Sequence, residues 1–315
     1  MGNENLPKTL VEAIKYFSDI DLCIDFVSEL RWPDGVTCPY CESSQVGFIS
    51  TRRIWKCKRC RKQFSVKVGT IFEDSPIGLD KWLAGMWLIA NAKNGISSYE
   101  VHRALGVTQK TAWFMLHRIR LAMQTGTFGK LSGEVEADET FIGGKGRFMH
   151  ADKKEQKIQG RGIVGKAVVL GLLERNSEDD CSMVRTKIIP NIRRKTVLPV
   201  IRKHVALGSQ VFTDALSSYA GLELDYIHEM VDHAEEYVRG NVHTNGLENF
   251  WSILKRCIKG TYVSIDVEHL FRYLDEEVFR FNNRKGKDAD RFHSVTKSVV
   301  GKRLTYKELT GKIDS

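Results

Sequence analysis

The hydrophobic period of the chain is helical in its first part and becomes strand-like after residue 133. From residue 8 to residue 30, apolar residues recur every three or four positions among acids and lysines, which predicts two short amphipathic helices with a break near Ser18 and Asp19. Residues 79–93 are more strongly apolar and predict a buried helix that ends at Asn94 and Gly95. The first part of the chain is therefore expected to be mainly helical.

Two further helical stretches, residues 97–105 and 109–120, are separated by a short turn. The turn begins with Gly106 and ends with Thr108, and a glycine followed by a helix-capping threonine is typical of a helix-turn-helix. If this motif binds DNA, side chains at the start of its second helix reach base edges and later ones reach the backbone. The candidate residues are Gln109, Lys110, Thr111, Arg118 and Arg120. An ordinary helical hairpin packed on a neighbouring domain is the alternative interpretation.

Beyond a glycine-containing junction near residues 125–133, strands alternate with helices. The predicted order is strand, strand, strand, helix, strand, weaker strand and helix, over residues 134–142, 167–173, 182–189, 196–206, 210–214, 225–231 and 243–256. This order indicates an α/β domain with a ribonuclease-H-like mixed sheet flanked by helices. A basic, glycine-rich excursion, residues 143–166, separates the first two strands and is interpreted either as a polyanion-binding segment or as a solvated loop.

The helix predicted over residues 243–256 has two chemically different sides. Its apolar side, suited to packing on a core, is formed by Leu247, Phe250, Trp251 and Leu254. Its polar side carries a carboxamide, a carboxylate and an ammonium group, from Asn245, Glu248 and Lys255. Glu248 and Lys255 are seven positions apart, which places them about two turns apart on one face. A helix with this polar face is a candidate for chemistry as well as for packing.

Composition and charge narrow the class of protein. The chain has 315 residues, enough for one large and one or two small domains, and 42% of them are hydrophobic. A formal net charge of +9 favours a polyanionic partner without identifying one. The sequence has neither the pattern of a signal peptide nor an apolar run long enough for a transmembrane helix, so we expect a cytoplasmic protein without a membrane partner.

Four of the seven cysteines form two Cys-x-x-Cys pairs, Cys38 with Cys41 and Cys57 with Cys60. Each pair can present two thiolates from one tight turn, and two such turns complete the ligands of a tetrahedral zinc ion. The spacing is typical of a zinc ribbon with structural Zn²⁺. A redox motif and four unliganded thiols are the alternatives. Five basic residues surround the second pair and either contact phosphates or form a solvated surface: Lys56, Lys58, Arg59, Arg61 and Lys62.

Three acids are expected at one place in the predicted sheet. Asp138 lies in the first strand and Asp214 ends the fourth, so the two stand side by side if these strands are neighbours, and Glu248 comes from the following helix. Carboxylates from separate elements are the hard oxygen ligands that Mg²⁺ or Mn²⁺ prefers. Two such ions about 4 Å apart activate the attacking oxygen and stabilise the leaving one in a displacement at phosphorus. The alternative is three unrelated exposed or salt-bridged acids.

These motifs together resemble the DDE-type transposases of bacterial insertion sequences, specifically the group with an N-terminal zinc ribbon. The resemblance covers residues 30 to 284 and rests on segments 31–35, 69–72, 137–145 and 213–214 and on the pattern His-Thr-Asn-x-x-Glu-Asn-x-Trp-Ser-x-Leu-Lys-Arg from residue 243. It implies that Asp138, Asp214 and Glu248 bind magnesium, and that Lys255 and the adjoining Arg256 contact DNA. An asparagine can take the third ligand position in this group, so Asn245 stays an alternative to Glu248, although a carboxylate binds Mg²⁺ more strongly.

The resemblance implies an enzyme that cleaves DNA at the ends of an insertion sequence and joins the resulting 3′ hydroxyl to target DNA. It also implies double-stranded DNA as the partner, a homodimer on that DNA and association with the nucleoid. Two other functions stay open, a catalytically idle DNA-binding regulator and a ribonuclease-H-like nuclease without strand transfer.

Five parts of the chain are predicted from these elements. They are N-terminal helices (1–33), a zinc ribbon (34–70), a helix-turn-helix domain (71–125), a ribonuclease-H-like catalytic domain (133–285) and a basic C-terminal tail (286–315). The catalytic part is expected to hold the three acids, the two small domains to hold zinc and contact DNA, and the tail is assigned no function.

Overall fold

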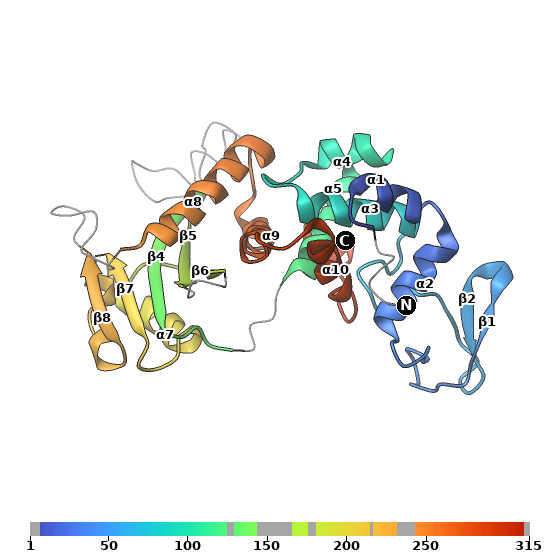
Figure 1. Ribbon diagram of the computed structural model, residues 1–315, viewed down its shortest axis with the longest axis horizontal. Helices are drawn as coiled ribbons and strands as arrows, with labels where there is room; N and C mark the ends of the chain where they lie inside the picture. The colour runs from blue at the N-terminus through green and yellow to red at the C-terminus, as the bar shows by residue number, and fades with distance from the viewer. Residues whose placement is uncertain are drawn as a thin grey trace. The chain divides into compact units, whose positions relative to one another are not determined.

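The computed structural model (Figure 1) describes residues 7–124, 129–143, 166–175, 181–214, 217–231 and 243–311. The chain folds into two compact units. Unit 1 consists of Met1–Gln124 and Gly286–Ser315, and unit 2 consists of Thr125–Lys285. Nearly all of the basic excursion predicted over residues 143–166 lies outside the described residues. None of the described helices is long and apolar enough to cross a membrane.

Unit 1 begins with two short helices, α1 (Leu10–Tyr16) and α2 (Ile20–Arg31). The side chain of Asp19 accepts a hydrogen bond from the backbone N–H of Asp21 at 2.8 Å, and it thereby satisfies one of the unpaired donors at the start of α2. The predicted break near Ser18 and Asp19 is therefore confirmed, because Asp19 caps a new helix.

A small antiparallel sheet follows, with its strands in the order β1 (Val46–Ile49), β2 (Ile54–Cys57) and β3 (Gln63–Phe64). Its apolar side chains gather around Trp55, whose ring centroid lies 5.5 Å from that of Trp32. A core of this size is typical of a small domain that depends on a bound metal for its stability.

Three helices form the centre of unit 1: α3 (Leu79–Asn91), α4 (Ser98–Leu105) and α5 (Gln109–Met123). Gly106 ends α4 in the left-handed conformation, with a φ of 59°, which a glycine adopts without strain. The side chain of Thr108 then caps α5. The predicted helix, three-residue turn and second helix are confirmed.

The C-terminal segment, expected to be only a basic tail, forms α10 (Asp288–Lys297) and α11 (Tyr306–Thr310) within unit 1. The ring of Phe292 lies 5.9 Å from that of Phe26 in α2 and 5.1 Å from that of Trp87 in α3. Apolar residues in this segment are few and widely spaced, so its helical period is weak in the sequence. Most of its large apolar side chains are nevertheless buried in the core of unit 1: Phe292, Val295, Val299, Leu304 and Leu309.

Unit 2 is built on a mixed five-stranded sheet in the order β6-β5-β4-β7-β8. The strands are β4 (Glu134–Gly143), β5 (Lys166–Glu174), β6 (Met183–Ile189), β7 (Gln210–Asp214) and β8 (Ile227–Val231). β4, β5 and β6 pair antiparallel, whereas β7 pairs parallel with both β4 and β8. The order of these strands and their helices along the chain is the predicted one, and the ribonuclease-H-like α/β fold is confirmed.

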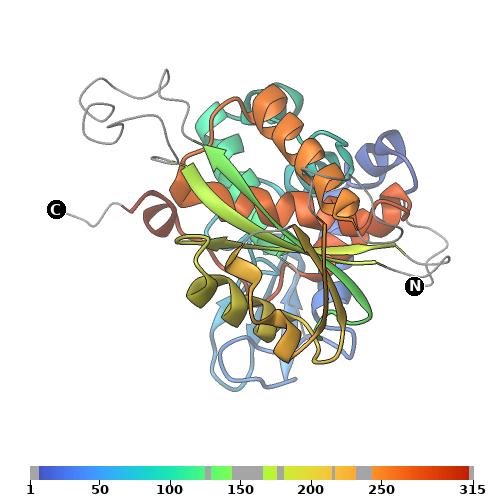
Figure 2. The same ribbon diagram turned by 90° about the vertical axis from the view of Figure 1, so that its left-hand side faces the viewer.

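Helices cover both faces of this sheet, as Figure 2 shows for α7 and α8. α7 (Arg194–His204) packs on one face, and α8 (Asn245–Cys257) and α9 (Leu270–Asn282) pack on the other. Because side chains alternate along a strand, the odd-numbered residues of β4 face α7 and the even-numbered ones face α8.

The described residues also include short helical turns. A 3₁₀ turn in unit 1 lies at Ser50–Arg52. In unit 2, 3₁₀ turns lie at Ser217–Tyr219, Leu222–Leu224 and Val267–His269, and a π-helical turn lies at Ile258–Tyr262.

α8 packs very close to the sheet because β5 carries a glycine beneath it. A Cβ atom at Gly171 would lie 2.5 Å from the ring of Trp251 and 2.9 Å from the side chain of Leu247. Gly171 is also the cross-strand partner of Asp138 on β4. A glycine inside a strand often marks such a close approach of another element. Here it lets the indole of Trp251 lie over β5 and reach β4.

We predict that Gly171→Ala forces α8 away from the sheet, because the added Cβ has no room. The expected loss is about 1–3 kcal/mol of unfolding free energy, the usual cost of overpacking, and urea unfolding followed by tryptophan fluorescence measures it. Gly129→Ala is the control within unit 2, since a Cβ there meets nothing within 4 Å. Equal stability of the two variants would contradict the close packing of α8.

Candidate metal centre and nucleic-acid interface

The pairing of β4 with β7 brings two of the predicted acids together. In their parallel register Glu136 is the partner of Phe212, and the same register continued by two residues places Asp138 beside Asp214. The charge of Asp214 acts on Asp138 and raises its pKa, as expected for neighbouring carboxyl groups. The condition under which the two acids stand side by side, that β4 and β7 are neighbours in the sheet, is met.

α8 carries the third acid to the same edge of the sheet. The indole Nε1 of Trp251 donates a hydrogen bond to Asp138 Oδ2 at 2.9 Å, which fixes this side of α8 against β4. Glu248 lies three residues before Trp251, about 60° away around the helix, and its charge also raises the pKa of Asp138. The three acids that the sequence predicts are thus near enough for the charges of Asp214 and Glu248 to act on Asp138, which is half-buried, whereas Glu248 is exposed.

The surroundings of Asp138 disfavour its charged form. Burial raises its pKa, hydrogen bonds from the Trp251 indole and the Glu139 N–H act in the opposite direction, and the charges of Asp214 and Glu248 add to the rise. The result is a pKa of about 6. A divalent cation would relieve this repulsion, because it supplies positive charge to several carboxylates at once. The donor set of carboxylate oxygens from three elements fits Mg²⁺ or Mn²⁺.

A fourth acid, Glu139, lies beside this cluster on the α7 face of the sheet. Burial raises the pKa of Glu139 to about 7 despite the neighbouring Tyr219 hydroxyl, and the charges of Asp214 and Asp138 add to the rise. Both of its carboxylate oxygens are buried. Glu139 is not a candidate from the sequence, because strand alternation turns it to the face opposite Asp138. Only the structure shows that the charges of Asp214 and Asp138 act on it.

The remaining candidates on α8 are exposed. Asn245 is the first residue of the helix, and Lys255 and Arg256 lie in its last turn. Asn245 is about 120° from Trp251 around the helix, twice as far as Glu248, and Lys255 is about 40° from Trp251. Lys255 therefore projects from the same side of α8 as Glu248, whereas Asn245 points further from Asp138.

The four predicted zinc ligands meet beside the small sheet of unit 1. The sulfur atoms of Cys38, Cys41, Cys57 and Cys60 all lie within 4.8 Å of one another, and those of Cys38 and Cys60 are 3.6 Å apart. The backbone N–H of Cys60 donates to Cys57 Sγ at 3.4 Å and lowers the pKa of that thiol to about 6, which favours the thiolate form that binds zinc. Four sulfurs at these separations support a structural Zn²⁺ site, as predicted.

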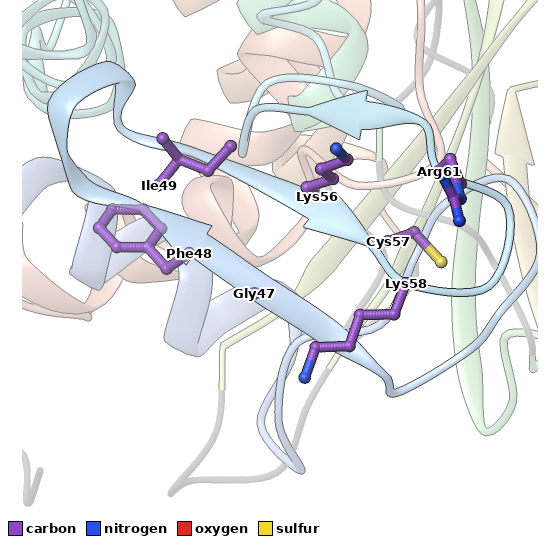
Figure 3. A pocket seen from close by; sticks show the side chains of 7 residues that line it. All are labelled: Gly47, Phe48, Ile49, Lys56, Cys57, Lys58 and Arg61. Carbon is purple, nitrogen blue, oxygen red and sulfur yellow. The ribbon is translucent and has the colours of Figure 1, made fainter.

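A groove of about 470 Å³ runs along β1 and β2 next to this cluster (Figure 3). It passes over Gly47, where a Cβ would meet nothing within 4 Å, and the ring of Phe48 at its edge is 51% exposed. Three cationic side chains line it, from Lys56, Lys58 and Arg61. Cations and an exposed aromatic ring around one groove suit the backbone and bases of a nucleic acid.

Three of the candidate DNA-contacting residues lie at the start of α5, where the sequence predicts them. Gln109 Nε2 donates to Ser98 Oγ at 2.9 Å, which joins the start of α5 to the start of α4. The Lys110 ammonium lies 4.8 Å from the ring centroid of Tyr306, and Thr111 donates its N–H to the residue that caps α5. Lys110 is exposed, whereas Gln109 and Thr111 are half-buried.

Arg118 and Arg120, expected to reach the DNA backbone, are instead buried inside unit 1. Their exposed fractions are 4% and 1%. The guanidinium of Arg118 donates to the carbonyl oxygens of Ile71, Glu73 and Leu304 at 2.8–2.9 Å. The expectation is wrong for these two arginines, because the loop before α3 and the C-terminal segment cover this part of α5.

Comparisons with known proteins match the two segments of the chain that contain these residues. Residues 130–282, which contain the three acids, match a family model described as ISXO2-like transposase domain, and residues 21–63, which contain the four cysteines, match one described as transposase zinc-ribbon domain. A Halobacterium salinarum protein described as an uncharacterized protein in transposable element ISH50 is 28% identical over 293 residues, 88% of this chain and 96% of that protein. An uncharacterized transposase-like protein of Haemophilus influenzae is 35% identical over 118 residues, 37% of this chain and 93% of that protein.

We predict that Asp138→Asn stabilises unit 2 at pH 8 when no divalent cation is added. The folded-state pKa of Asp138, about 6, lies above its ordinary value of 3.8, so folding favours the protonated carboxyl group. Its contribution to stability is fully present below pH 3.8. It is lost as the pH rises through 6, because the buried group must then carry a charge. At pH 8 the variant should therefore gain up to about 3 kcal/mol of unfolding free energy.

Denaturant unfolding at pH 8 and pH 4 measures this gain, which should nearly disappear at pH 4. Asp266→Asn, a change at an exposed acid of the same unit, is the control and should alter neither value. A gain that is as large at pH 4 as at pH 8 would show that the carboxylate charge is not its cause.

Proposed function

The chain belongs to the ISXO2-like transposase family, and we propose that it cleaves DNA at the ends of a mobile element and joins these ends to target DNA with the help of bound Mg²⁺ or Mn²⁺. One observation supports the proposal above all: the charges of Asp214 on β7 and Glu248 on α8 both raise the pKa of Asp138 on β4. The zinc cluster is not a candidate for this chemistry, because four thiolates leave no open position on the metal.

Two successive phosphoryl transfers make up the proposed reaction. In the first, water attacks a backbone phosphorus at the element's end, and the bond from phosphorus to the 3′ oxygen breaks to give a 3′ hydroxyl. In the second, this hydroxyl attacks a phosphorus of the target strand, and the 3′ oxygen of that strand leaves and takes up the proton. Two bound divalent ions would activate the attacking oxygen and stabilise the leaving one. The side chains act by position and charge, and no covalent link to the protein forms.

Glu248 is proposed as the third metal ligand in preference to Asn245. Two observations support this choice. Glu248 lies about 60° from Trp251 around α8, on the side that is bonded to Asp138, and its charge acts on Asp138. Asn245 lies twice as far around the helix, and a carboxamide is a weaker Mg²⁺ ligand than a carboxylate.

DNA contacts are proposed on both units. In unit 2, Lys255 and Arg256 would contact the DNA backbone near the acids, since Lys255 projects from the same side of α8 as Glu248. In unit 1, the groove lined by Lys56, Lys58 and Arg61 would bind phosphates, and the start of α5, with Gln109, Lys110 and Thr111, would read base edges. Two copies of the chain on one pair of DNA ends complete the proposal.

We predict that Asp214→Asn lowers DNA cleavage and strand transfer by roughly three orders of magnitude, because it removes one carboxylate ligand. A labelled element end incubated with target DNA and Mg²⁺ measures both steps. DNA binding and zinc content should stay at wild-type values, and Asp266→Asn serves as the control for a charge change elsewhere in unit 2. Wild-type activity of Asp214→Asn would refute the metal site.

The same assay distinguishes the alternatives. A joined product supports a transposase, cleavage without joining supports a nuclease, and DNA binding without either supports a regulator. Glu248→Gln and Asn245→Ala decide the third ligand: the first should lose activity as Asp214→Asn does, and the second should lose much less. The reverse order of these two losses would assign the ligand to Asn245.

We predict that the double variant Lys56→Ala/Lys58→Ala binds DNA about tenfold more weakly at low salt. Each lysine that neutralises a phosphate releases counterions from the DNA, and this release favours binding, so removing the lysines weakens it. Fluorescence anisotropy over a range of salt concentrations should show a slope that falls by about one for each lysine that neutralises a phosphate in the wild type. Lys195→Ala/Lys203→Ala is the charge-matched control, because these exposed lysines lie on α7, on the face of the sheet opposite α8. Equal slopes for the two double variants would exclude the groove from DNA binding.

A further inference from the structure

The start of α8 has no side-chain cap of its own. The first backbone N–H groups of a helix have no partner within the helix, and a Ser, Thr, Asp or Asn before it usually accepts one of them. Thr244 occupies this position but makes no such hydrogen bond. The N–H of Leu247 instead donates to Glu136 Oε2 at 2.9 Å, across the interface with β4. A carboxylate of the sheet thus acts as the helix cap.

Glu136 is buried at 1% exposure and is held in place by a cation. Arg175, which directly follows β5, donates from Nε to Glu136 Oε1 at 2.7 Å, and its guanidinium lies 4.3 Å from the ring centroid of Phe212 on β7. Arg175 also donates to the carbonyl oxygen and to Nδ1 of His243, just before α8. The ion pair therefore joins β4, β5 and the chain that leads into α8.

The sequence leaves room for this arrangement at one residue of α8. A Cβ atom at Gly246 would lie 2.9 Å from Glu136 Oε2 and 2.9 Å from the side chain of Leu173. Glycine costs helix stability relative to alanine, so its presence in the first turn has a packing reason here. Only a residue without a side chain lets the helix start lie directly on the carboxylate.

Two hydrogen bonds attach α8 to β4, and Glu248 lies between them on the helix. Glu136 holds the N–H of Leu247, and Asp138 holds the indole of Trp251. Two residues along a strand span about 6.6 Å, and four along a helix span about 6 Å. The two attachments are thus matched in length, and together they restrain α8 from sliding along β4 and from rotating about its own axis.

We infer that Glu136 is a positioning residue of the metal centre: by capping α8 from β4, it sets the distance of Glu248 from Asp138 and Asp214. This inference rests on the proposed function, because it concerns the same three acids. Glu136 itself is engaged by Arg175 and the helix start, and so it acts through α8 and not as a ligand. Its loss should shift α8 at the end where Glu248 lies.

Mn²⁺ binding to the full, zinc-loaded chain tests this role without depending on catalysis. Calorimetric titration should show that Glu136→Gln binds Mn²⁺ roughly 10- to 100-fold more weakly, the usual effect of losing a residue that orients a metal ligand. Glu134→Gln is the matched control. Glu134 also pairs with Arg175, with 3.3 Å between Arg175 Nη1 and Glu134 Oε2, but it is more exposed, and its change should leave Mn²⁺ binding within about twofold.

Gly246→Ala is a second variant that keeps the ion pair and its charge. The added Cβ should push the start of α8 away from Glu136 and weaken Mn²⁺ binding as Glu136→Gln does. Circular dichroism and the unfolding midpoint identify which variants are folded. If Glu136→Gln does not fold, Gly246→Ala decides the question, with Gly129→Ala as its control.

The outcomes separate the two proposals. A folded Glu136→Gln or Gly246→Ala variant that binds Mn²⁺ like the wild type overturns the positioning role. Asp214→Asn reports on the metal centre itself and should abolish Mn²⁺ binding. If Asp214→Asn binds Mn²⁺ normally, the proposed metal centre fails. If Asp214→Asn loses binding and Glu136→Gln does not, only the role of Glu136 fails.

Discussion

The close packing of α8 against β4 and β5 is the constraint on which the rest of unit 2 depends. Two glycines make it possible from opposite sides, Gly171 beneath the indole of Trp251 and Gly246 above the carboxylate of Glu136. At each place one element has no side chain, so a side chain of the other element packs directly on its backbone. The indole of Trp251 thereby reaches Asp138, and the carboxylate of Glu136 reaches the N–H of Leu247. The pairing of β4 with β7 places Asp138 beside Asp214, and the close packing of α8 on the sheet brings the charge of Glu248 to act on Asp138.

Glu136 and Asp138 lie on the same face of β4, but different charged groups surround the two carboxylates, and so their roles differ. The charge of Glu136 is offset by Arg175, which commits that carboxylate to a structural role. Asp138 receives hydrogen bonds from the Trp251 indole and a backbone N–H, both uncharged donors, while two further acids lie near it. Burial and the charges of these two acids raise the pKa of Asp138, against the effect of the two hydrogen bonds. A buried acid with a raised pKa and further acids beside it is suited to receive a metal ion.

The sequence was sufficient for the order of the elements of unit 2 up to α8, for the meeting of the four cysteines and for the pair Asp138 and Asp214. Strand and helix periods, turn glycines and cysteine spacing are local signals. The sequence failed where a residue's role depends on what covers it. Arg118 and Arg120 have the spacing of exposed cations on α5, but the distant C-terminal segment and the loop before α3 bury them. Glu136 was missed for the converse reason, since strand alternation shows which face it shares with Asp138 but not that a helix start lies above it.

Unit 1 is built from both ends of the chain, so its C-terminal segment, Gly286–Ser315, contributes to its core. The chain leaves unit 1 at Gln124 and returns at Gly286, so unit 2 is inserted into unit 1. Arg118 ties the two parts of unit 1 together, because its guanidinium donates to carbonyl oxygens on both sides of the insertion, those of Ile71 and Leu304 among them. A buried guanidinium bonded in this way fixes backbone positions. The helix pair α4 and α5 therefore depends on the part of the chain that follows unit 2, and a cut at residue 285 would remove part of the core that supports α5.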